Sequence, residues 1–133
     1  MRPPRFQDFA LDLIKNTTGT TRVQTLTEAG DTTHPFGVAV TTGTGETRWQ
    51  FIGQLATGEK HDDPDTPVQG DPVAPWAGDV PADPEGWLAA AVTAAESPEI
   101  VAITRWSTRP GEAAKPGLTI DFHNGARIFV RKL

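Results

Sequence analysis

Apolar and polar positions alternate along the chain in patterns that predict two helices and six strands. At the start, apolar side chains recur every three or four residues and form one helical stripe, made of Phe6, Phe9, Ala10, Leu13 and Ile14. Pro4 suits a first helical turn, and residues 16–19, ending in Gly19, supply a stop. We therefore expect an amphipathic helix with one buried face.

Three strand-like segments follow this helix, at residues 22–28, 36–41 and 48–55. The second segment places Phe36, Val38 and Val40 on one face by alternation, and the third does the same with Trp49 and Phe51. Residues 43–45 separate these two segments and contain two glycines, which is typical of a hairpin turn. The first half therefore reads as one helix followed by three strands.

A second helix is predicted from Asp83, which suits the N-cap position, with Pro84 at the first helical position. Its apolar stripe consists of Trp87, Leu88, Ala91, Val92 and Ala95. The Ser97-Pro98 pair ends the pattern, because the residue before a proline disfavours helical backbone.

Three further strands are expected at residues 100–108, 118–122 and 126–132. The first carries apolar residues on both faces, as in a more central strand. For the last two, a three-residue loop with Gly125 in a left-handed bulge gives one apolar face and sets Asp121 opposite Arg127. This register predicts Phe129 on the outer face beside Thr119.

The order of elements predicts one α+β domain over residues 1–133. Its two α-βββ halves, 4–55 and 83–133, are expected to form an antiparallel sheet of about six strands with both helices packed on one face. Residues 56–82, called the acidic segment below, join the halves. Similar turns before the last strand of each half leave an internal duplication and independent origins equally open.

Charge is unevenly distributed, although the chain as a whole carries only −5. From residue 56 to 85, eight acidic side chains accompany Lys60 alone, while the remainder is slightly basic. Six of the twelve prolines also lie between residues 56 and 85, five of them in the acidic segment, which disfavours helix and central strand there. The chain has no cysteine, which excludes disulfides and thiol chemistry, and no long apolar run. We expect a soluble, cytoplasmic protein.

Catalytic and metal chemistry find little support in the sequence. Residues 61–65 gather one histidine and three aspartates, but the spacing matches no metal loop, so neither a metal nor another cofactor is expected. His123 and Asp121 form the least implausible catalytic pair, yet the hairpin register points them in different directions. A catalytic role is accordingly not favoured.

Candidate binding residues fall into two groups, one acidic and one basic. Asp62, Asp63, Asp65 and Trp76 belong to the acidic segment, and Trp76 either attaches this segment to the domain or presents itself to a partner. Arg105, Arg127, Phe129 and Arg131 are expected to share the outer sheet face. Either the acidic segment folds against this basic face, or its charges serve only to keep the sheet soluble. The net negative charge makes nucleic acid an unlikely ligand.

These features favour a binding or interaction protein that recognises another protein and lacks enzymatic activity. One concrete form is an acidic inhibitor or immunity-type protein, whose acidic loop steers the encounter with a basic partner. The alternative is a small hydrolase or ligand-binding enzyme that uses Asp, His and Thr in a pocket between sheet and acidic segment. A homodimer through the exposed sheet face is also consistent with the pattern.

Overall fold

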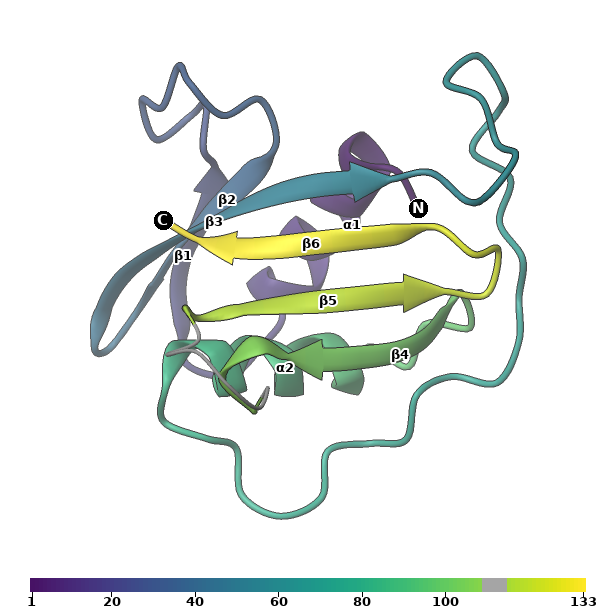
Figure 1. Cartoon of the computed structure of the whole chain (residues 1–133). Coiled ribbons are helices and arrows are strands. Elements are labelled where there is room, and N and C mark those ends of the chain that lie inside the picture. Colours follow the sequence, from purple (N-terminus) through teal and green to yellow (C-terminus); the bar gives the residue numbers. More distant parts are fainter. Residues whose placement is uncertain (109–114) are drawn as a thin grey trace.

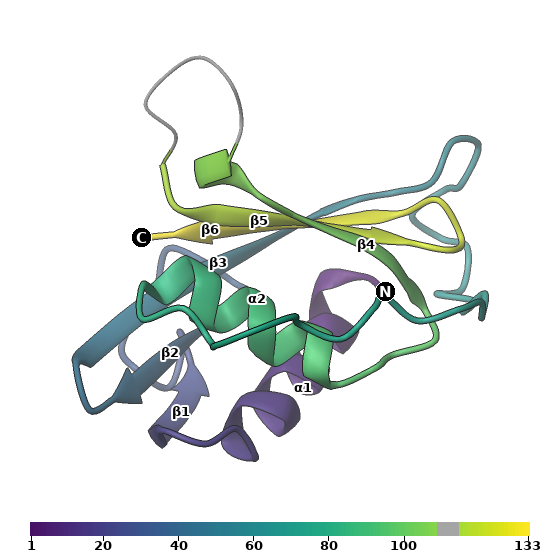
Figure 2. The same ribbon diagram turned by 90° about the horizontal axis from the view of Figure 1, so that it is seen from below.

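The computed structural model, which describes residues 1–108 and 115–133, has two layers: a six-stranded antiparallel sheet and two helices on one of its faces (Figure 1, Figure 2). This arrangement confirms the predicted α+β class. The elements are α1 (Pro3–Lys15), β1 (Thr20–Thr25), β2 (Gly37–Thr42), β3 (Gly45–Gln54), α2 (Pro84–Ala94), β4 (Ile100–Arg105), the 3-10 helix η1 (Trp106–Thr108), β5 (Gly117–Phe122) and β6 (Arg127–Lys132).

The strands lie in the order β1-β2-β3-β6-β5-β4, so each half contributes a three-strand meander. The last strands of the two halves, β3 and β6, pair at the centre of the sheet, with Phe51 opposite Val130. Because α1 and α2 also contact each other on the covered face, the two halves share one core.

Helix α1 buries the stripe that its sequence predicts. Phe6, Ala10 and Ile14 are fully buried, while Phe9 and Leu13 are partly buried against the same core. The ring of Phe6 makes edge contacts with Phe51 of β3 and Phe122 of β5. This single aromatic side chain thus joins the first helix to strands of both halves.

The hairpin between β5 and β6 has the predicted register. Ile120 pairs with Ile128, Asp121 with Arg127, and Thr119 with Phe129. Gly125 adopts a φ of 90°, as a left-handed bulge requires. The turn chemistry near the glycine therefore determines which residues face the helices and which face outward.

The prediction of a central strand at residues 100–108 is wrong, since β4 is an edge strand that ends at Arg105. Its apolar residues have different surroundings: Ile100 is buried and Ile103 partly buried in the core, whereas Val101 lies at a bulge with 46% of its surface exposed. Residues 106–108 form η1 instead of continuing the strand.

Helix α2 begins as predicted, with the Asp83 side chain accepting a hydrogen bond from the Gly86 amide at 2.8 Å. The expected single apolar stripe is only partly right. Ala95 is exposed, and Ala89, Ala90 and Thr93 are buried although they lie outside that stripe. A helix that is apolar around its circumference needs cover on more than one side, and the sheet covers only one of them.

Candidate functional site

The sheet face opposite α1 and α2 is the first functional candidate among the described parts of the chain. Both α-helices lie against the other face (Figure 2). Register and alternation place Ile52, Phe129, Thr119 and Thr104 in one row across strands β3, β6, β5 and β4. Ile52 is 40% exposed and Phe129 is half-buried. The row therefore presents apolar surface at the centre of an otherwise polar face.

Two of the predicted arginines flank this row. Arg127 lies beside it, 2.6 Å from the Asp121 carboxylate, and Arg131 lies on its other side in the pair with Gly117. Arg131 is exposed and has no ion-pair partner among the described residues. Arg127, Phe129 and Arg131 thus share one face, as the hairpin register predicts.

Trp106 extends this face in a way that sequence reasoning missed. Its indole lies over Gly117, where an added Cβ would meet the ring at 2.2 Å. The indole nitrogen donates to the Thr119 hydroxyl at 2.9 Å. The available signal was a glycine at the start of β5 opposite an aromatic residue just after β4, but using it required the strand register and the 3-10 turn.

The placement of Arg105 on the outer face is wrong, because Arg105 faces the helices. Its Nε donates to Glu85 and its Nη2 to Asp83, both at 2.8 Å. Alternation explains the difference: Arg105 pairs with buried Leu118, and the side chains of such a pair lie on the same face. The Arg105 guanidinium pairs with the acids at the start of α2 and is not part of a basic outer surface.

Glu85 is the most buried acidic side chain of the described structure, at 2% exposure. Its carboxylate accepts hydrogen bonds from the Ser107 hydroxyl, the Arg105 guanidinium and the Gly117 amide. Burial by itself raises the pKa of Glu85, but the bonds from Ser107, Arg105 and Gly117 outweigh it, so the pKa lies below its ordinary value. The Glu85 carboxylate therefore links α2 to η1 and β5 through its hydrogen bonds.

The acidic segment lies against the domain, but not on the face predicted for it. Its first part contacts the arginines of the chain start: Asp65 accepts from the Arg2 amide at 2.9 Å and from Arg5 Nε at 3.1 Å, and Glu59 accepts from Arg2 Nη2 at 2.9 Å. Burial by itself raises the pKa of Asp65, but the hydrogen bonds from Arg5 and Arg2 lower it by more, so the pKa lies below its ordinary value. Arg5 also holds Glu99 at 2.6 Å.

The remaining acids of this segment differ in their surroundings. The Asp63 carboxylate accepts from the Lys60 amide at 2.9 Å and so stabilises a local turn. Asp62 is exposed, as are Asp71 and Asp79, and no ion pair joins these three side chains to the described residues. The charge of the segment is thus only partly neutralised within the fold.

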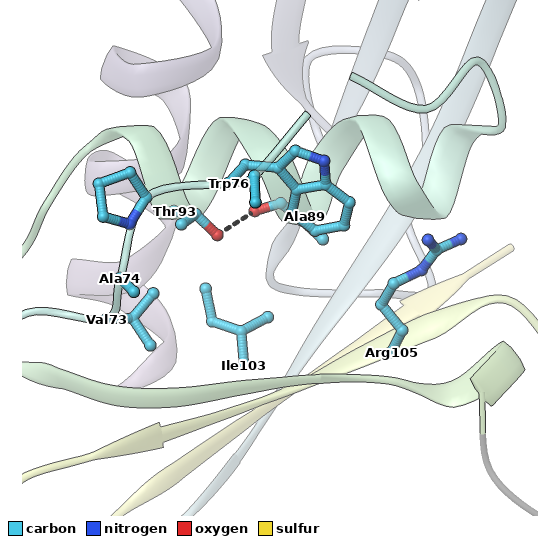
Figure 3. Close-up of a pocket in the computed structure, with 9 residues that line it drawn as sticks. Val73, Ala74, Trp76, Ala89, Thr93, Ile103 and Arg105 are labelled. Carbon is cyan, nitrogen blue, oxygen red and sulfur yellow. Dashed lines mark hydrogen bonds between the residues drawn. The ribbon is translucent and has the colours of Figure 1, made fainter. Parts of the chain in front are cut away.

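Trp76 lies over α2 and is partly buried against the core (Figure 3). With Val73 and Ala77 it forms one wall of a cleft of about 400 Å³, whose other walls are Ala89 and Thr93 of α2 and Ile103 and Arg105 of β4. A second cleft, of about 530 Å³, lies between Met1–Pro4, the end of β3 and His61.

The three histidines lie apart from one another. His34 contacts Asp31 at 2.8 Å, and the hydrogen bonds from His34 and Thr33 lower the pKa of Asp31 to about 2, but this pair lines neither cleft. His123 contacts the Asp71 carbonyl at 2.9 Å, while Asp121 bonds to Arg127, so the two do not meet. No cluster of three or more His, Asp or Glu side chains suited to a metal occurs in residues 1–108 and 115–133.

Comparison with known proteins gives no relative: no known protein family, no curated protein and no solved structure matches this chain. Within the described ranges, no helix is long and apolar enough to cross a membrane.

Proposed function

We propose that this chain is a protein-binding module that docks a partner protein through the sheet face opposite α1 and α2. The observation that carries the proposal is the exposed apolar row of Ile52 and Phe129 on central strands, with Arg127 and Arg131 beside it. Aromatic and arginine side chains at the centre of a surface are typical of binding hot spots.

The charge of this face indicates what kind of partner it fits. Within the described strands, alternation places Arg22, Arg48, Arg127 and Arg131 on this face, together with two acids, Glu46 and Asp121. The chain as a whole carries −5. A partner surface with an apolar centre and an acidic rim complements this face. If the same face of a second copy of the chain docked here instead, the arginines of the two copies would face one another.

Paired substitutions on the face test this proposal. In Ile52→Thr/Phe129→Thr the strand propensity is retained while the apolar row is lost. We expect a partner captured from the native host to bind this variant at least about tenfold more weakly, since central anchors each contribute about 1–2 kcal/mol. Val80→Thr, at an exposed position of the acidic segment, is the matched control and should bind normally.

A second candidate is an acidic inhibitor or immunity-type protein, which the exposed carboxylates of Asp62, Asp71 and Asp79 favour. Such charges would accelerate association with a basic partner. The triple change of these residues to Asn would then abolish binding while Ile52→Thr/Phe129→Thr leaves it intact. That combined result would overturn the sheet-face proposal.

A further inference from the structure

Helix α2 has two apolar sides, and only one of them faces the sheet. On the other side, Ala89 and Thr93 line the cleft beneath residues 73–77 of the acidic segment (Figure 3). Ile103 and Arg105 of β4 form its floor and one end. We call the surface made by Ala89, Thr93, Ile103 and Arg105 the α2–β4 groove. The groove is a feature of the folded body, because all four residues belong to α2 or β4.

The segment that covers the groove has an extended, proline-containing sequence, Pro72-Val73-Ala74-Pro75-Trp76-Ala77. Within it only Val73 and Trp76 are shielded from solvent, and both line the groove. A spacing of three residues places side chains on the same side of a polyproline II helix. The groove therefore contacts two apolar side chains that lie three positions apart on an extended backbone.

Among the residues that the structure describes, packing alone joins this stretch to the rest of the domain. Hydrogen bonds to the body end at Gly70, whose amide donates to Pro98 at 2.8 Å, and at the carbonyl of Asp71, and resume at Asp83. Between these points, in residues 72–82, the described hydrogen bond joins Trp76 Nε1 to the Asp79 carbonyl within the segment itself. Displacing residues 72–77 would therefore break no hydrogen bond to α2 or β4.

The covering residues also leave space. The cleft of about 400 Å³ remains open between them and the groove. The cleft is open to solvent, so this space can be reached from outside the molecule. A segment with bulkier side chains than Val73 and Ala74 would bury more of the groove than the chain's own residues do.

We propose that the α2–β4 groove is a binding site for an extended, proline-containing apolar segment of a partner protein, and that residues 72–77 occupy it in the free protein. Proline restricts such a segment to its bound shape beforehand, which lowers the entropy lost on binding. The chain's own segment competes at a high effective concentration because it is tethered at both ends. Recognition at this groove is separate from docking at the opposite face of the sheet.

The probe that tests this site is a dye-labelled synthetic peptide with the sequence of residues 70–79, titrated against full-length variants by fluorescence anisotropy. In Val73→Ser/Trp76→Ser the chain's own segment loses both apolar contacts, so the groove becomes available. We expect the peptide to bind this variant at least about tenfold more tightly than the unchanged protein, in which the groove is occupied. Binding should also raise the thermal midpoint of the variant.

Three controls make the result decisive. A peptide with Ser at both positions corresponding to Val73 and Trp76 should not bind, and Val80→Ser should behave like the unchanged protein. Pro72→Gly/Pro75→Gly retains both apolar side chains but loosens the segment, and it should give intermediate affinity. Equal peptide binding by all variants, or equal binding of the Ser-substituted peptide, would refute the proposal, as would absence of binding by a double variant with native circular dichroism.

Discussion

At the scale of single residues, Glu85 shows how a buried charge is made stable. The carboxylate is removed from water, yet a guanidinium, a hydroxyl and two backbone amides all donate to it. Each donor belongs to a part of the chain at least 20 residues away. Charge-assisted bonds of this kind offset desolvation only when every lone pair is used. Glu85 therefore stabilises the folded state only while it is ionised.

The pH dependence of stability tests this role. The folded pKa of Glu85 lies below its ordinary value of 4.5, so its contribution is present above that pH and is lost as the pH falls through the folded pKa. We expect Glu85→Gln to lower the free energy of unfolding by about 2–3 kcal/mol at pH 7. In urea titrations the difference from the unchanged protein should shrink below pH 4.5. Asp62→Asn is the exposed control, and a constant difference at all pH values would contradict this role.

Asp83, two residues earlier, acts as the N-cap of α2 and as a partner of Arg105. Two substitutions separate these contributions. Asp83→Ala removes both and should cost about 1 kcal/mol, which corresponds to about 3–5 °C in the thermal midpoint. Asp83→Asn retains the cap and should lose much less. If the two variants melt together well below the unchanged protein, the charge and not the cap is responsible.

At the scale of elements, helices were easier to predict than strand positions. The stripe of α1 and the cap of α2 were confirmed because both depend on neighbours within four residues. The position of β4 at the sheet edge was missed, because apolar residues on both faces occur in a central strand and also in an edge strand next to a helix. Ile103 is partly buried because it packs against the core, and the order of apolar residues within the strand does not reveal this contact.

The hairpin of β5 and β6 is the exception among the strands. Gly125 and the requirement for one apolar face together allowed its register to be deduced, and this placed Phe129 and Arg127 on the outer face correctly. Arg105 lies on a strand without such a turn constraint, and its predicted side was wrong. The candidate surface was therefore predictable only where a turn determined the register.

At the scale of the whole molecule, the acidic segment is part of the fold and not a free tether. Arg2 and Arg5 bond to its first part, His123 and Asn124 contact its middle, and Trp76 packs over α2 (Figure 3). These contacts come from the start, the end and the second helix of the chain. The segment thus completes the cover that the apolar circumference of α2 requires.

Replacing residues 57–80 with a Gly/Ser linker of equal length tests this structural role. We expect the free energy of unfolding to fall by about 2–4 kcal/mol, from lost burial of Val73 and Trp76. Exposed apolar surface on α2 should also increase binding of the dye ANS. A second linker that retains residues 70–79 should recover most of the stability. Unchanged stability in both replacements would show that the segment contributes nothing to the fold.

The sequence by itself determined the two helices, the order of α-βββ halves and the register of the last hairpin, because each depends on periodicity or on turn residues close in the chain. Only the tertiary structure decided where the acidic segment lies and which face Arg105 occupies. The segment pairs with Arg2 and Arg5, about 60 residues away, and Arg105 with Glu85 and Asp83. Long-range charge pairing leaves no periodic signal, since any acid and any base are chemically suited to one another until the fold brings two of them together.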